Sequence, residues 1–240
     1  GDKNNPVTHG AMTALAAAEA ELRVSPARLK TPLRRSPDGA YIAISWAEAE
    51  KLLKEKTQQA GASVAAVSGD PTSSINEVLS SILNQQGSSD FYFMPDEEQP
   101  AAVAWEAMGG QGRLGYDMEG SDCILAVGAP VLESWGVVAA NRSLFNRTHP
   151  VGGEAGQKLI YAGAVQNNTA AGADLWLPMK SGTDMALLLG MAHLVIKAGK
   201  NGFAAGLGNF ASFAAAYTPE KVSAITGVPQ ERLEAAAKAL

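Results

Sequence analysis

Short apolar runs alternate with longer segments of mixed polarity through the middle of the chain. A run of about four to eight apolar residues is typical of a strand buried on both faces, whereas apolar residues that recur every three or four positions indicate an amphipathic helix. Strands that alternate with helices form a parallel sheet. We therefore expect an α/β fold, with a largely parallel sheet and helices on both faces. The predicted strands are residues 63–69, 91–94, 123–128, 158–163 and 175–179.

The beginning of the chain departs from this pattern. A Pro-Asp-Gly turn at residues 37–39 lies between two extended arms, which predicts a small hairpin over residues 33–45. Ser45 and Glu48 then form a capping box, in which each residue satisfies a backbone N–H of the other. A helix is therefore predicted from this box to about residue 59.

The end of the chain changes again beyond residue 199. Thr-Pro-Glu at residues 218–220 and Val-Pro-Gln at residues 228–230 each start a short predicted helix. The chain then divides into an N-terminal segment with the hairpin and first helix (1–60), a nucleotide-binding-like α/β domain (61–199) and a helical C-terminal appendage (200–240). The opening residues GDKNNPVTHG are typical of the middle of a protein, so we expect these segments to be part of a longer one.

Composition and charge narrow the classes of function. The 240 residues are 46% hydrophobic and 18% charged and include 25 glycines, which is typical of a globular α/β protein. A net charge of −5, with no stripe of lysine or arginine, argues against nucleic acid as a partner. The longest apolar run, residues 185–196, is shorter than the roughly 20 residues that cross a bilayer. We expect no direct membrane span.

The side chains that could carry chemistry are few. The single cysteine, Cys123, excludes a disulfide or an all-cysteine metal site within this chain, and in a buried strand it packs as a small hydrophobic residue. His9, His149 and His193 have no spacing typical of metal ligands. The three acids at residues 96–98 could act in acid–base catalysis, but at a predicted helix start they more often match the helix dipole. No metal site and no catalytic residue is predicted.

The loops that follow the predicted strands hold the best candidate site. Ligands of parallel sheets bind beyond the carboxyl ends of the strands. The loops at residues 68–70, 128–130, 163–169 and 181–184 combine glycines with polar side chains, so their backbone N–H groups can approach a nucleotide or a pyrophosphate. Ordinary turns use the same residues, and neither of the two commonest phosphate-binding glycine motifs is present. Both readings stay open on the pattern alone.

Four blocks of the chain, taken in order, resemble a known family. The blocks are SPARLKTPLRRSPDGAYIAISWAEAEKLL, SDCILAVGAPVLESWG, KLIYAGAVQNNTAAGADLWLPMKSGTDMALLLGMAHLVIKAG and YTPEKVSAITGVPQERLEAAAKAL. They are similar to successive blocks of molybdopterin oxidoreductases, the group of formate dehydrogenase and DMSO reductase large subunits. The resemblance covers nearly the whole chain and implies the fold of that family.

The resemblance also implies which residues line a cofactor pocket. In the family, the corresponding loops hold the guanine-nucleotide arms of the pterin cofactor, molybdopterin guanine dinucleotide. In this sequence the matching positions, read as a vestigial pocket, are Gly128, Ala129, Pro130, Glu133, Gln166, Asn167, Asn168, Thr169, Ser181, Gly182, Thr183 and Asp184.

The chain departs from the family pattern where the family carries its metal ligands. The segment NPVTHG at residues 5–10 is followed by AMTALAAAEAEL, without the cysteine that usually closes an iron–sulfur cluster motif. After the predicted strand at 91–94, MPDEEQPAA stands where the family has a cysteine, selenocysteine or serine ligand and a nearby histidine. The usual Asp-Pro-Arg after the fourth strand is replaced by Gly-Ala-Val at residues 163–165. We expect no cofactor in this chain.

Within the family, this combination is most similar to the molybdopterin-like subunits of periplasmic menaquinone reductase complexes. That resemblance implies a non-catalytic scaffold in an oxidoreductase complex that passes electrons from periplasmic cytochrome c to menaquinone. The implied partners are a multihaem cytochrome c subunit, a ferredoxin-like iron–sulfur subunit and an integral membrane quinone-binding subunit. The implied location is the periplasmic side of the inner membrane.

Two alternatives belong to other classes of function. The chain could be part of an active molybdenum or tungsten bis-pterin oxidoreductase similar to formate dehydrogenase, with its metal ligands outside this chain and with molybdopterin guanine dinucleotide as its cofactor. It could also be a stand-alone nucleotide-binding domain, since the strand-end loops do not require a pterin.

Overall fold

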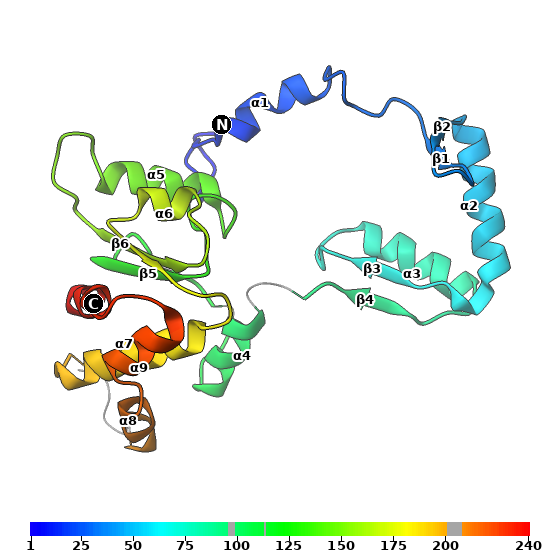
Figure 1. Ribbon diagram of the computed structural model, residues 1–240. Coiled ribbons are helices and arrows are strands. Elements are labelled where there is room, and N and C mark those ends of the chain that lie inside the picture. The colour runs from blue at the N-terminus through cyan, green and yellow to red at the C-terminus, as the bar shows by residue number, and fades with distance from the viewer. Residues whose placement is uncertain (96–98, 113, 201–207) are drawn as a thin grey trace. The chain divides into compact units, whose positions relative to one another are not determined.

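The chain folds into two compact units, one of which is made of a single segment and the other of two. The structure is a computed structural model, and it describes residues 1–95, 99–112, 114–200 and 208–240. One unit comprises residues 21–116, and the other combines residues 1–20 with residues 117–240 (Figure 1). The acidic residues 96–98, considered above for acid–base chemistry, lie outside the described residues.

The unit of residues 21–116 begins with the predicted hairpin. Strands β1 (Leu33–Arg35) and β2 (Tyr41–Ala43) pair in an antiparallel register. Helix α2 (Trp46–Ala60) follows, and one half of the predicted capping box forms, because the Ser45 hydroxyl accepts a hydrogen bond from the Glu48 backbone N–H at 3.2 Å. The Glu48 carboxylate pairs with Arg34 of the hairpin at 3.5 Å, so the helix start is joined to the turn structure before it.

The same unit contains a two-stranded parallel sheet. A short 3₁₀ turn, η1 (Gly61–Ser63), leads to β3 (Ala66–Ser68), which pairs with β4 (Phe91–Phe93). Helix α3 (Ile75–Gln85) connects the strands, and α4 (Gln99–Ala107) follows.

Two predictions for this unit were wrong in detail. The sequence Asp-Pro-Thr at residues 70–72 predicts a helix start at Asp70. Helix α3 begins five residues later, because the Asp70 carboxylate accepts hydrogen bonds from the Thr72 backbone N–H and hydroxyl and folds the chain into a turn. The predicted burial of β3 on both faces also fails, since Val67 is 61% exposed. Helix α3 packs against β3, and the exposed Val67 alternates along the strand with buried Ser68, so one face of β3 is left open.

The other unit contains a parallel sheet of three strands. The strands β5 (Cys123–Val127), β6 (Lys158–Gly163) and β7 (Leu175–Pro178) pair in that order, with β6 in the centre. Helix α5 (Val138–Thr148) connects β5 to β6, and the single turn α6 (Asn168–Gly172) connects β6 to β7. The sequence predicts the five parallel strands, and hydrogen bonding divides them between two sheets rather than one.

Helices cover both faces of the three-stranded sheet, as predicted from the sequence. Leu159 and Tyr161 of β6 pack with α5 and α6, whereas Ile160 and Ala162 pack on the opposite face. Figure 1 shows α5 and α6 on one side of β5 and β6, and α7 and α9 on the other. Successive side chains of a strand point to opposite faces, so this one strand contributes to both cores.

The C-terminal helices build the second core. They are α7 (Asp184–Lys197), α8 (Gly208–Ala215), α9 (Pro219–Thr226) and α10 (Gln230–Ala239). Both predicted short helices form: the Thr218 hydroxyl caps α9, and Pro229 stands directly before α10. Buried Val222 of α9 and Leu233 of α10 meet Leu187 of α7 in one cluster over the sheet.

The remaining element is α1 (Ala14–Leu22), near the start of the chain. In the part of the chain that the structure describes, none of the helices combines the length and the apolar character needed to cross a membrane. The segment boundaries 1–60, 61–199 and 200–240 remain a prediction, and the compact units follow other boundaries.

The packing of α7 against α9 depends on one glycine. A methyl group at Gly190 would lie 2.5 Å from a Val222 methyl carbon, which is far below van der Waals contact. We expect Gly190→Ala to lower the free energy of unfolding by about 1–3 kcal/mol through overpacking, although alanine favours a helix by about 1 kcal/mol over glycine. Urea unfolding measures the change.

The matched control is the same substitution in a Val222→Ala background, where the clashing methyl groups are absent. Gly190→Ala should cost less there than in the parent chain. An equal cost in both backgrounds would show that the helix contact does not require glycine.

Candidate functional site

The carboxyl ends of β5, β6 and β7 surround a cavity of about 360 Å³. The strands end at Val127, Gly163 and Pro178, and the loops that leave them form the walls. The residues that line it are Gly128, Pro130, Tyr161, Gly163, Ala164, Val165, Asn167, Met179, Ser181, Gly182 and Asp184. The cavity therefore lies where the strand pattern predicts a ligand site.

Glycine is required at two of these strand ends. Gly128 has a φ of +63°, a conformation that other residues rarely adopt, and its N–H donates to Ala162 at 2.8 Å across the sheet. A methyl group on Gly163 would lie 2.6 Å from the Tyr161 hydroxyl oxygen. These glycines keep the backbone close to the cavity.

The structure brings together half of the twelve residues predicted for the site. Gly128, Pro130, Asn167, Ser181, Gly182 and Asp184 line the cavity. The other predicted residues, which lie in the same loops but outside the lining, are Ala129, Glu133, Gln166, Asn168, Thr169 and Thr183.

Asn167 caps the short helix α6 and connects it to the central strand. Its side-chain oxygen accepts a hydrogen bond from the Ala170 N–H at 2.9 Å, and its side-chain nitrogen donates to the Tyr161 hydroxyl at 2.9 Å. The Trp176 ring N–H donates to the Gly163 carbonyl at 3.2 Å from the next strand. The sequence did not predict that Tyr161 lines the cavity, because this residue occupies one position of a largely apolar strand.

The charge of the cavity is negative. Among the described residues that line it there is one carboxylate, Asp184, and no lysine or arginine. Asp184 is the first residue of α7, and one of its oxygens would lie 3.7 Å from a methyl group placed on Gly128. A negatively charged lining favours ligands that donate hydrogen bonds over ligands that are anions.

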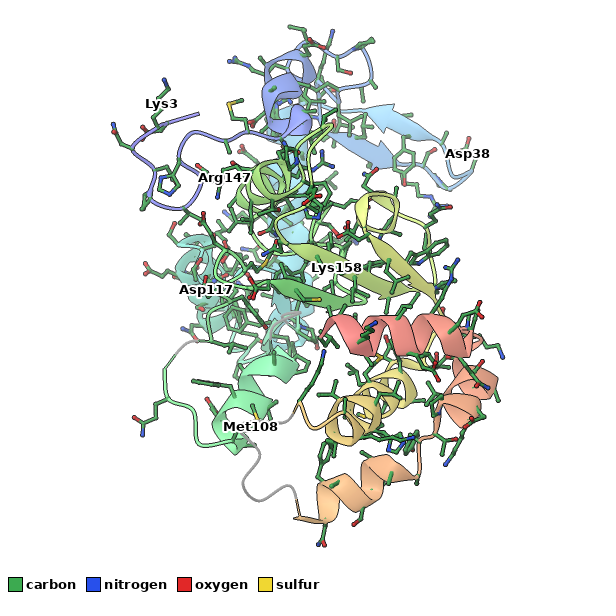
Figure 2. The ribbon with its side chains drawn as sticks, turned by 90° about the vertical axis from the view of Figure 1, so that its left-hand side faces the viewer. Lys3, Asp38, Met108, Asp117, Arg147 and Lys158 are labelled. Atoms are coloured by element: carbon green, nitrogen blue, oxygen red, sulfur yellow. The ribbon has the colours of Figure 1, made fainter. Side chains whose placement is uncertain are left out.

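The amino-terminal edge of the same sheet holds a second polar group. Figure 2 labels Lys158, the first residue of β6, whose N–H donates to the Asp122 carbonyl at 2.8 Å. Asp174, just before β7, accepts from the Leu159 N–H at 2.7 Å and lies 3.2 Å from His149. A cavity of about 320 Å³ adjoins this edge.

His149 is therefore a structural residue at the end of α5. Its ring stacks on Phe145 with centroids 4.1 Å apart, and its second ring nitrogen lies 2.9 Å from the Thr148 hydroxyl. Nothing in the spacing of the sequence signals its pairing with Asp174, 25 residues away. Across residues 1–95, 99–112, 114–200 and 208–240, no cluster of three or more His, Cys, Asp or Glu side chains could hold a metal ion.

Cys123 lies at the first position of β5, at this same edge. Burial raises the pKa of its thiol above the ordinary value, so the side chain stays protonated at neutral pH. A protonated, partly buried thiol packed against the α7 core fits the predicted role of a small hydrophobic residue.

Comparison with known proteins gives a consistent result. The molybdopterin oxidoreductase family profile matches residues 28–209. Over 242 aligned residues the chain is 50% identical to the menaquinone reductase, molybdopterin-binding-like subunit of Nitratidesulfovibrio vulgaris, covering 100% of this chain and 35% of that protein. It is 26% identical to the F420-dependent formate dehydrogenase 1 subunit alpha of Methanococcus maripaludis, covering 88% of this chain and 32% of that protein.

A solved structure shows the same fold. Acetylene hydratase from Pelobacter acetylenicus superposes with a TM-score of 0.59 at 23% sequence identity, covering 97% of this chain and 33% of that one. The chain thus spans about a third of the length of the relatives it matches.

The cap of α6 gives a direct test of the loop geometry. Asn167→Ala removes the acceptor for the Ala170 N–H and the donor to Tyr161, and should lower the free energy of unfolding by about 1–2 kcal/mol. Asn167→Asp keeps the cap and should cost less. Urea unfolding of both variants measures the difference.

The neighbouring Asn168→Ala is the control, because this exposed side chain lies outside the cap. It should change stability by less than about 0.5 kcal/mol. If Asn167→Ala were as stable as Asn168→Ala, the cap would not hold the loop.

Proposed function

This chain belongs to the molybdopterin oxidoreductase family, and we propose that it forms part of the molybdopterin-like subunit of a membrane-associated, menaquinone-reducing respiratory complex. The observation that carries the proposal is the 50% identity to a menaquinone reductase subunit across the whole chain. Identity at this level, over both compact units, supports a common assembly as well as a common fold.

We propose further that the chain is a scaffold without redox catalysis of its own. The sequence after β4 continues with Met94 and Pro95, where the resemblance to the family leads us to expect a metal-ligating side chain. Its one thiol, Cys123, starts β5, and at about 3.3 Å per residue it lies roughly 15 Å from the loop at the other end of that strand. That separation keeps Cys123 away from the cavity.

Among the described residues, the side chains that line the cavity provide no cation for the cofactor that the family implies. Molybdopterin guanine dinucleotide carries a diphosphate, and proteins bind diphosphates with lysine or arginine side chains, metal ions or clusters of backbone N–H groups. The described lining has Asp184 as its charged residue and no cation. The proposed scaffold role therefore needs no bound pterin.

In the proposed complex, electrons pass through neighbouring subunits. They would come from a multihaem cytochrome c, cross a ferredoxin-like iron–sulfur subunit and reach menaquinone in an integral membrane subunit on the periplasmic side of the inner membrane. The exposed surface of this chain would then serve to hold those partners in place.

Metal and pterin analysis of the purified full-length complex tests this proposal. We expect neither molybdenum nor tungsten by mass spectrometry, and no pterin fluorescence after oxidation, in a preparation that reduces menaquinone. A formate dehydrogenase carried through the same procedure is the positive control. A stoichiometric amount of either metal would instead favour an active bis-pterin oxidoreductase.

A further inference from the structure

A basic segment leads from the end of α1 into the hairpin. Residues 23–35, which we call the basic arm, contain five cations and no acid, in a chain whose net charge is −5. The cations are Arg23, Arg28, Lys30, Arg34 and Arg35. Before β1 the arm contains neither helix nor strand, as the trace between α1 and β1 in Figure 1 shows. The arm is therefore a concentrated positive surface on an acidic chain.

Most of this charge is not neutralised within the part of the chain that the structure describes. Arg34 pairs with Glu48 at 3.5 Å, and both side chains are about half exposed. The side chains of the other four cations make neither a hydrogen bond nor an ion pair with any described residue, and all four residues are exposed. Like charges along one short segment repel one another, so an acidic surface placed against them would stabilise the arm.

Apolar side chains are interleaved with these cations. Val24 is 83% exposed and Leu29 is 72% exposed, both within the arm. Tyr41 of β2 and Trp46 of α2, which follow the arm, are exposed as well. Neither strand of the hairpin has a buried residue, and a two-stranded hairpin is only marginally stable in water by itself. Exposed arginine, tyrosine and tryptophan together are typical of a protein–protein interface.

The surroundings of the arm favour a protein surface over a lipid surface. Asp38, labelled in Figure 2, lies in the turn between β1 and β2, and Glu48 lies in the first turn of α2. A uniformly anionic membrane would repel these acids, whereas a protein partner can present charges of both signs. The backbone N–H groups of residues 29–31 also have no partner among the described residues, which disfavours insertion into hydrocarbon.

We propose that the basic arm docks on an acidic face of another subunit of the complex. The inference rests on the proposed function, because it requires an assembly of several subunits. The free cations of the arm pair with aspartate and glutamate carboxylates of that subunit, and Val24 and Leu29 are buried at the contact. Salt screens charge pairs of this kind, so the contact weakens as ionic strength rises.

Zero-length cross-linking of the purified full-length complex with a carbodiimide identifies what the arm contacts. The reagent joins a lysine amine to a carboxyl group that touches it, and Lys30 is the lysine of the arm. We expect mass spectrometry to find Lys30 joined to an aspartate or glutamate of another subunit. Links from Lys30 only to its own polypeptide, or no link at all, would overturn the proposal.

Charge reversal measures how much the arm contributes to assembly. Arg28→Glu combined with Lys30→Glu removes no side-chain contact among the described residues. The double variant should bind the rest of the complex at least about tenfold more weakly than the parent subunit in about 0.15 M salt, and the difference should narrow in about 0.5 M salt. Surface plasmon resonance with the immobilised remainder of the complex measures both affinities.

Lys54→Glu combined with Lys56→Glu is the matched control. These two exposed lysines of α2 have the same spacing along the chain, and their reversal changes the net charge equally. The control should bind within about twofold of the parent subunit. Equal losses of affinity in the two double variants would show that net charge, and not the arm, drives assembly.

Sedimentation with phosphatidylglycerol vesicles distinguishes a lipid surface from a protein partner. We expect the full-length subunit to show no vesicle binding that depends on Arg28 and Lys30. Vesicle binding that the reversal of these two residues abolishes would overturn docking on a protein.

The two proposals fail in different ways. A full-length protein that purifies without other subunits would overturn the proposed assembly itself. In an intact complex, equal affinities of the parent subunit and the Arg28→Glu, Lys30→Glu variant would overturn the docking surface alone. Thermal unfolding of each variant identifies any loss of folded protein, and Arg28→Gln with Lys30→Gln provides the comparison if the reversed pair does not fold.

Discussion

The burial of β6 on both of its faces and along both of its edges is the constraint on which this unit depends. Ile160 and Ala162 are fully buried under the C-terminal helices, and Leu159 and Tyr161 are nearly so under α5 and α6. Hydrogen bonds to β5 and β7 occupy the two edges of the strand. A shift of one residue would exchange the two faces and place the Tyr161 ring under α7. The register of β6 therefore sets where all three strands end, and so where the cavity lies.

The C-terminal helices pack on β6 and also contact the loop that follows β7. Gly190 lets α7 approach Val222 of α9, and the backbone N–H of Lys180 donates to the Thr226 carbonyl at 2.8 Å. That bond attaches the loop after β7 to the end of α9. The cavity wall that includes Ser181 and Asp184 is thereby supported from behind by the same helices that complete the core.

Local signals in the sequence were sufficient for most elements and for the place of the cavity. The strand runs, the Ser45 cap and the helix start at Thr218 each depend on neighbouring residues, and each formed at its predicted place, although β3 is shorter than its run and exposes Val67. Pairings between distant residues have no such signal. The bond from Asn168 to Glu133 spans 35 residues, and the His149 to Asp174 contact spans 25. The division of the strands between two sheets also has no local signal, because the sequence of one strand does not determine which strand it pairs with.

The alternation of side chains along β6 has an evolutionary consequence. Each face has its own core, so a substitution on the α5 face can be compensated by α5 and α6 without disturbing the α7 face. Several residues of the strand-end loops belong to these cores, since Val131 and Leu132 pack on the α5 face and Met179 packs on the α7 face. Exposed residues of the same loops, such as Gln166 and Ser181, lie outside both cores and can vary while the fold is inherited intact.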